Sequence, residues 1–168
     1  LFSACYDYVL RHEEDASLRD PVYEDYARAL SRDGQSEKAL TRIQELLFFG
    51  KDSVNMKNRY VNPVIDSIRA DRRYLRILRS KYEILWDIYS ETNNPEILEA
   101  AANTSELIIY VIDKIRINIS EEESRIVLGD SYRDSYLLAI RDFDLCYKNT
   151  GDRRYLEKAF EFAEKSKV

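Results

Sequence analysis

Gly34-Gln35-Ser36-Glu37-Lys38-Ala39-Leu40 has a similar sequence near the other end of the chain. The second copy is Gly151-Asp152, two arginines, and then Tyr155-Leu156-Glu157-Lys158-Ala159-Phe160. Between them, the segment from Asn93 to Ala101 is a degenerate third copy, so the turns stand at 34, 93 and 151, at steps of 59 and 58. A turn that recurs at nearly constant spacing predicts a stack of helix–turn–helix units.

Composition favours long helices over a sheet. Of the 168 residues, 45% are apolar and 34% charged, with only four glycines and three prolines. The net charge of −5 argues against nucleic acid as a general partner, and no apolar run approaches the roughly 18 residues of a membrane span. Two cysteines, 141 residues apart, exclude a disulfide framework and favour a cytoplasmic protein.

The apolar periodicity predicts one all-α domain over 1–168, with about seven helices. Several starts and ends carry a local signal, whereas 50–61 has no clear period and is expected to be irregular. The predicted elements are a helix over 1–14, helices from Asp20-Pro21 to Gly34 and from Ser36 to Leu47, a short helix over 63–70, helices beginning at Asp71 and at Asn94-Pro95, a helix of about 30 residues from the capping box Ser120–Glu123, and a last helix after Gly151.

These elements group into three units, at about 20–49, 71–117 and 120–168. The chain starts without Met and stops inside a predicted helix. We therefore expect it to be a fragment of a longer protein.

All three units resemble tetratricopeptide repeats. Large residues and alanines recur at the expected places, as in Tyr23, Tyr26, Ala27 and Leu30, followed by Ala39. The resemblance implies a right-handed stack of antiparallel helix pairs, with unusually long helices because the step exceeds that of the family. Large or charged residues, Trp86 and Asp144, stand where the family has a small residue, so helix crossing angles are expected to deviate.

A narrower resemblance covers about 71–168. Asp-Arg-Arg-Tyr-Leu occurs at 71–75 and 152–156, and the segment from Phe162 to Lys167 is similar to the helical region preceding a CHAT domain, a caspase-like peptidase of bacteria. This resemblance implies a non-catalytic interaction scaffold that serves as the sensor or regulatory region of such a peptidase. The alternative is the sensor region of a bacterial signalling or transcription regulator.

The chain offers little for catalysis. Its one histidine, His12, lies seven residues from Cys5, about 10 Å along a helix, so the two cannot pair. One histidine and two distant cysteines give no metal-ligand spacing, and no glycine-rich phosphate loop is present. We expect no catalytic residue, no metal and no cofactor. A hydrolase would need Cys146 to contact His12, and this alternative stays open.

The repeat resemblance implies that stacked first helices line a groove for a protein or peptide partner. The matching positions are Glu24, Arg28, Arg32, Glu83, Asp87, Glu91, Arg141 and Lys148. The groove would be mixed in sign with an acidic middle at 83–91, a pattern that selects partners. The alternative is that these charges are only solvated.

A second candidate surface is a basic stripe. Arg72, Arg76 and Arg79 fall on one helix face at steps of four and three. They could dock an acidic partner or a phosphate backbone, and the simpler interpretation is a solvated face paired with nearby carboxylates.

Overall fold

The computed structural model describes residues 16–48, 58–118 and 131–167 of the chain. Within these ranges it holds six α-helices, one short 3-10 helix (η1) and no strand, which confirms the predicted all-α class. The elements are α2 (Ala16–Arg32), α3 (Ser36–Leu47), η1 (Ile65–Ser67), α5 (Arg72–Thr92), α6 (Pro95–Asn118), α8 (Ser131–Thr150) and α9 (Arg153–Lys165).

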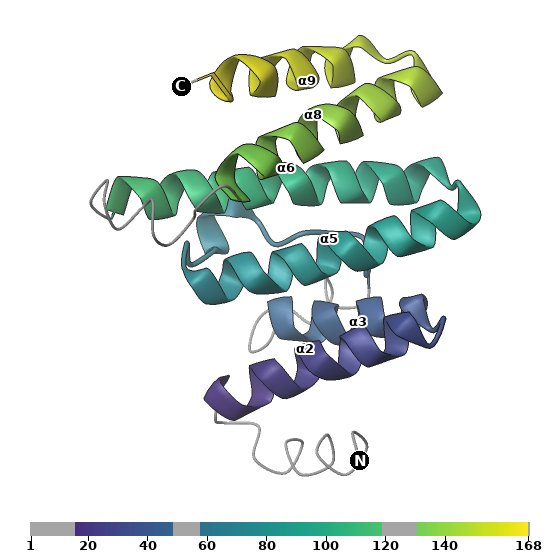
Figure 1. Ribbon diagram of the computed structural model, residues 1–168, viewed down its shortest axis with the longest axis vertical. Coiled ribbons are helices and arrows are strands. Elements are labelled where there is room, and N and C mark those ends of the chain that lie inside the picture. The colour runs from purple at the N-terminus through teal and green to yellow at the C-terminus, as the bar shows by residue number, and fades with distance from the viewer. Residues whose placement is uncertain (1–15, 49–57, 119–130, 168) are drawn as a thin grey trace.

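The six helices form three consecutive antiparallel pairs that stack in chain order (Figure 1). Each helix packs chiefly against its neighbours in sequence, and α2 also touches α5. The pair α2–α3 lies at one end of the stack and α8–α9 at the other, with α8 inclined to α6. None of the helices in the described ranges combines the length and the apolar run that a membrane crossing requires.

The three predicted turns share one backbone conformation. Gly34, Asn93 and Gly151 all have a left-handed φ, of 73°, 50° and 71°. Asparagine enters this region more readily than most residues with a side chain, which explains how Asn93 replaces a glycine in the middle copy. The repeated sequence therefore marks a repeated turn.

Two identical sequences begin helices in the same way. Asp71 accepts a hydrogen bond from the backbone N–H of Tyr74 at 2.8 Å, and Asp152 accepts one from the backbone N–H of Arg154 at 3.0 Å. Both aspartates are N-caps, as the Asp-Arg-Arg-Tyr-Leu repeat indicates. The start of α6 at Pro95 is likewise confirmed.

Three predicted boundaries are wrong. Helix α2 begins at Ala16 and contains Pro21, because Asp20 is buried against arginines instead of capping a helix. Ser36 is already the first residue of α3, and no side chain caps that helix. The short helix expected over 63–70 is only the three-residue η1.

Some predicted features lie outside the described residues. These are the helix over 1–14 with Cys5 and His12, most of the irregular segment 50–61, and the capping box at 120–123. The long third-unit helix is described from Ser131 onward.

The apolar core has two parts that meet at α5 and α6. The larger part joins α2, α3, α5 and α6, and the smaller part joins α6, α8 and α9. Trp86 and Tyr89 of α5 pack against both parts, with ring centroids 5.3 Å apart. The C-terminal half of α5 therefore links the last helix pair to the rest of the stack.

A buried lysine of α5 forms a hydrogen bond to the segment that connects α3 to α5. Lys81 of α5 is fully buried, and its Nζ donates to Gln44 Oε1 at 2.9 Å and to the carbonyl of Val61 at 2.8 Å. Gln44 in turn donates to the carbonyls of Asn58 and Val61, both at 3.0 Å. These bonds join the chain at Asn58 and Val61 to α3 and α5.

Candidate functional site

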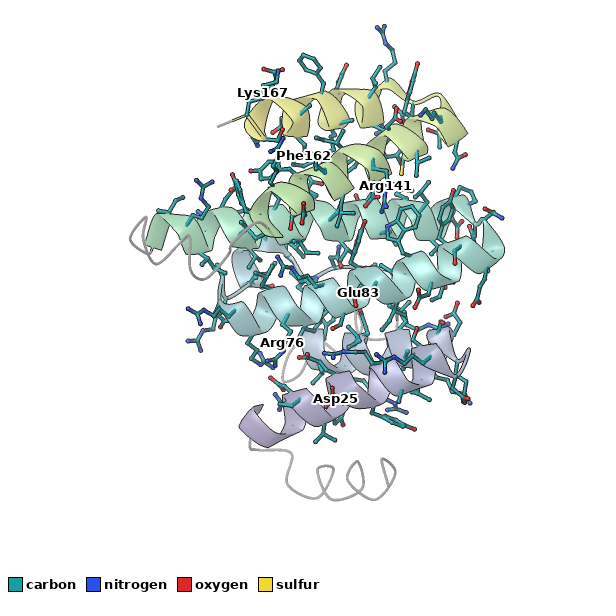
Figure 2. The ribbon with its side chains drawn as sticks, in the orientation of Figure 1. Asp25, Arg76, Glu83, Arg141, Phe162 and Lys167 are labelled. Atoms are coloured by element: carbon teal, nitrogen blue, oxygen red, sulfur yellow. The ribbon has the colours of Figure 1, made fainter. Side chains whose placement is uncertain are left out.

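One face of the stack is formed by the first helix of each pair. Figure 2 shows Asp25 on α2, Arg76 and Glu83 on α5, and Arg141 on α8, following one another along the stack. The charged residues predicted on α5 form a single line at steps of three and four, namely Arg72, Arg76, Arg79, Glu83, Asp87 and Glu91. The basic stripe and the acidic middle of the predicted groove are therefore two halves of the same surface, which we call the α5 ridge.

Two hollows flank the α5 ridge. The hollow between α2 and α5 has a volume of about 190 Å³, and four of the predicted groove residues line it: Arg28, Arg32, Glu83 and Asp87. The hollow toward α8 has a volume of about 250 Å³ and is lined by Arg79, Tyr82, Glu83, Ser105, Ile108, Asp134, Ser135 and Leu138. Glu83 is exposed and belongs to both hollows, so it stands at the centre of this face.

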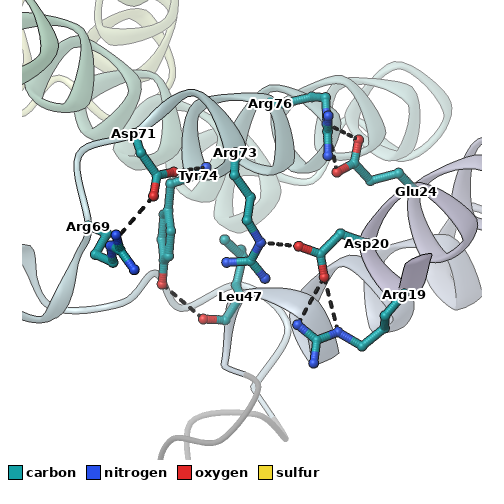
Figure 3. A network of polar contacts seen from close by, with 9 residues as sticks. All are labelled: Arg19, Asp20, Glu24, Leu47, Arg69, Asp71, Arg73, Tyr74 and Arg76. Atoms are coloured by element: carbon teal, nitrogen blue, oxygen red, sulfur yellow. Dashed lines mark hydrogen bonds and ion pairs between the residues drawn. The ribbon is translucent and has the colours of Figure 1, made fainter. Parts of the chain in front are cut away.

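Two arginines of α5 pair with buried carboxylates of α2, and one of them, Arg76, belongs to the α5 ridge (Figure 3). Arg73 pairs with Asp20, and Arg76 pairs with Glu24 at 2.8 Å. Both carboxylates are buried, at 1% exposure each. The predicted basic stripe is consequently not a free cationic surface at Arg76, which weakens its use for a phosphate backbone.

Glu24 was expected on the groove surface, and this prediction is wrong. The residue is buried between α2 and α5, where it holds Arg76 and, at 3.7 Å, Arg28. Burial raises the pKa of Glu24, while the hydrogen bond and the charge of Arg76 oppose that rise. The ion pair with Asp20 raises the pKa of Arg73. Glu24 therefore joins α2 to α5 from a buried position.

The acidic half of the α5 ridge is not neutralised in this way. Asp87 accepts a hydrogen bond from the Ser31 hydroxyl at 2.7 Å, which joins α2 to α5 without a cation. Within the described ranges, no lysine or arginine forms an ion pair with Glu83, Asp87 or Glu91. The exposed charge of this half is therefore negative.

The two predicted residues of α8 have internal partners. Lys148 pairs with Asp144 at 2.6 Å. Arg141 donates to Asp142 Oδ1 through Nε and Nη2, at 3.1 and 3.0 Å, and its guanidinium lies 4.0 Å from the centre of the Trp86 ring. Arg141 therefore contributes to the junction between α5 and α8.

The functional prediction missed the buried part of that junction. Asp142 has no exposed surface, and its Oδ2 accepts the Tyr82 hydroxyl at 2.8 Å, while Arg141 donates to the Tyr82 oxygen at 2.8 Å. Burial raises the pKa of Asp142, and the bonds from Tyr82 and Arg141 oppose the rise. The indole N–H of Trp86 lies close enough to lower that pKa but meets no acceptor in hydrogen-bonding geometry. A single aspartate in an apolar helix stripe was the only signal in the sequence.

The described residues offer little for catalysis. Cys146 is buried, and burial raises the pKa of its thiol to about 12, which keeps it protonated and unreactive at neutral pH. In the parts of the chain that the structure describes, no group of three or more His, Cys, Asp or Glu side chains could hold a metal ion. The contact between His12 and Cys146 that a hydrolase would need is not described, because His12 lies outside the described residues.

A third hollow lies at the end of the stack, between α8 and α9. It has a volume of about 640 Å³ and includes Ile140, Leu156 and Phe160. Phe160 is 67% exposed and Leu156 40%. The floor of this hollow is largely apolar, although Arg141, Asp144 and Glu157 also line it.

Comparison with known proteins identifies no relative: no family model, no curated protein and no solved structure matches the chain.

Proposed function

We propose that this chain is a non-catalytic scaffold that binds an extended segment of a partner protein along the face of α2, α5 and α8. The observation that carries the proposal is the pair of adjoining hollows, of about 190 and 250 Å³, that share Glu83. Each is smaller than the roughly 300–1,000 Å³ typical of small-molecule sites. Two side-chain-sized hollows on either side of a charged ridge suit successive side chains of a peptide.

The surroundings of the ridge support a preformed site. Arg76 and Asp87 are held from α2, by Glu24 and by Ser31, and Arg141 is held on α8 by Asp142. A surface whose side chains are already ordered loses less conformational entropy on binding. Rigid spacing of the three first helices is what a peptide needs for a fixed register.

The test compares two adjacent leucines of α8. A random twelve-residue peptide library is selected on the purified chain, and the enriched peptides are measured by fluorescence polarisation. Leu138 lines the hollow beside Glu83, whereas Leu137, also exposed, does not. Leu138→Arg should weaken binding by about tenfold or more, while Leu137→Arg leaves it unchanged. Equal effects of the two substitutions, or no enriched peptide, would contradict the proposal.

We also propose, on the sequence resemblance, that the stack is a right-handed tetratricopeptide-like superhelix that acts in the cytoplasm as the regulatory region of a CHAT peptidase. The left-handed turns at Gly34, Asn93 and Gly151, one inside each helix pair, support a repeated unit. The test is whether peptides selected on this face change the cysteine-peptidase activity of the parent protein. A parent that instead binds DNA in a peptide-dependent manner would favour the alternative, a transcription regulator.

A further inference from the structure

We infer that the partner segment is basic and places a lysine or arginine side chain against Glu83, in the hollow between α5, α6 and α8. This inference rests on the proposed function. It follows from a difference between the charges of this face: most of its cations form ion pairs within the protein, whereas its central carboxylates do not.

Most cations of the face have carboxylate partners inside the protein. The pairs are Arg73 with Asp20, Arg76 with Glu24, Arg141 with Asp142 and Lys148 with Asp144. Three of these carboxylates are at most 1% exposed. Because each cation already has a fixed counter-charge, an acidic partner would gain little by approaching it.

The carboxylates at the centre of the face lack such partners. Glu83 and Glu91 are exposed, and Asp134, across the hollow on α8, is exposed as well. Within the described ranges, none of the three forms an ion pair with a lysine or arginine. The charge of Arg79, one turn away on α5, acts on Glu83, but the carboxylates of Glu83 and Asp134 outnumber it. A cation from a partner would therefore meet a net negative charge.

The two hollows differ in the charge of their walls. In the hollow between α2 and α5, Arg28 and Arg32 stand opposite Glu83 and Asp87, so the charges balance. In the hollow toward α8, Glu83 and Asp134 outnumber the single Arg79. The second hollow is the one that selects a cation.

The walls of that hollow also suit the stem of a long basic side chain. Tyr82, Ile108 and Leu138 line it with largely apolar surface, and Ser105 turns its hydroxyl to the Ala102 carbonyl at 2.8 Å. Lysine and arginine bury their methylene groups on apolar surface while the charged end reaches the rim. Glu83 and Asp134, both exposed, line the same hollow and would pair with that charged end.

Two cations of the first helices do not alter this balance. Arg72 is exposed at the start of α5, eleven residues from Glu83, or about 16 Å along the helix. That separation exceeds the screening length of about 8 Å at physiological salt. Arg32 lies on α2, in the other hollow.

The experiment reverses the charge at Glu83. The random twelve-residue library is selected in parallel on the unmodified chain, on Glu83→Lys and on Glu157→Lys. Glu157 is an exposed carboxylate of α9, far along the stack, and serves as the charge-matched control. Circular dichroism verifies that each variant keeps its helix content. Dissociation constants of the enriched peptides are then measured at low and high salt.

We expect the unmodified chain and Glu157→Lys to enrich peptides with lysine or arginine at one shared position. These peptides should bind Glu83→Lys about tenfold more weakly or worse, and high salt should weaken their binding to the unmodified chain. Enriched peptides without a basic residue, or equal binding to Glu83→Lys, would overturn the inference. If such peptides were still lost on Leu138→Arg but not on Leu137→Arg, the proposed function would stand while the inference failed. If neither leucine mattered, both would fail.

Discussion

The residue at each turn between paired helices determines how the chain reverses direction. Gly34, Asn93 and Gly151 all adopt a left-handed backbone, which costs an ordinary L-residue roughly 1–2 kcal/mol. A Cβ built at Gly34 or Gly151 would meet no atom within 4 Å. Substitution at these glycines therefore tests backbone conformation without steric clash.

Gly151→Ala should lower the free energy of unfolding by about 1 kcal/mol, because alanine resists the φ of 71°. Gly151→Asn should lose less, since asparagine already occupies the equivalent turn at Asn93. Urea denaturation followed by circular dichroism measures both. Equal losses for alanine and asparagine would contradict the conformational explanation.

Lys81 is the residue at which burial and charge conflict most clearly. Burial lowers the pKa of its amine to about 7, from an ordinary 10.5. Below about pH 7 the amine is protonated in both the folded and the unfolded chain, and above about pH 10.5 it is neutral in both. In between, the unfolded chain binds the extra proton, so the free energy of unfolding rises with pH.

From about pH 7 to about pH 9, this difference should add on the order of 1–2 kcal/mol to the free energy of unfolding. Urea denaturation at the two pH values measures the change. Lys81→Met has no amine to titrate, so its increase should be smaller by that amount, even though it removes the hydrogen bonds of Lys81 to Gln44 and to the Val61 carbonyl. A common pH slope for both proteins would show that Lys81 is not the group responsible.

At the scale of elements, the junction between α5 and α8 depends on one buried carboxylate. Asp142 accepts hydrogen bonds from Tyr82 of α5 and from Arg141 of α8. The guanidinium of Arg141 lies over the ring of Trp86. Trp86 is the single tryptophan of the chain, so fluorescence excited selectively at tryptophan reports on this junction without a signal from the 13 tyrosines. Such a reporter separates loosening of the junction from loss of helix.

Tyr82→Phe should lower the free energy of unfolding by about 1–3 kcal/mol, because the buried Asp142 loses a donor. Tyr89→Phe is the matched control: Tyr89 also packs on Trp86, but no hydrogen bond from its hydroxyl joins it to the described residues. Urea denaturation followed by tryptophan fluorescence compares the two. A loss for Tyr89→Phe as large as that for Tyr82→Phe would argue against the carboxylate as the cause.

At the scale of the whole molecule, contacts run mainly between consecutive helices. Helix α6 is packed on both sides, by α5 and α8, whereas α9 packs chiefly on α8. Only two residues of α9 are buried, Ala159 and Phe162. In a stack of this kind, stability depends on the number of neighbours that each unit has.

Amide hydrogen exchange should therefore be faster in α9 than in α6. Phe162→Ala should accelerate exchange in α9 further, because the ring packs on Tyr136 and Phe143 of α8, and should leave α2 and α3 unchanged. Mass spectrometry of peptic fragments resolves these helices. Equal exchange in α6 and α9, or acceleration in α2 and α3, would indicate that the stack opens as one unit.

The sequence by itself determined the all-α class, the antiparallel pairs and the position of each turn. These features are local: a left-handed φ at Asn93, or the capping bond of Asp71 to Tyr74, involves residues within a few positions of each other. Apolar periodicity likewise acts within single helices. The boundary of α2 was missed because a contact with α5 holds Asp20 inside the helix.

Only the tertiary structure decided which charges are available to a partner. Glu24 and Arg76 are 52 residues apart, and their pairing depends on how α2 packs on α5. The same packing leaves Glu83 exposed between two hollows. Helical spacing predicts which residues share a face, but neutralisation depends on long-range contacts. For this reason only the folded chain shows which charges of the α5 ridge are neutralised by other helices.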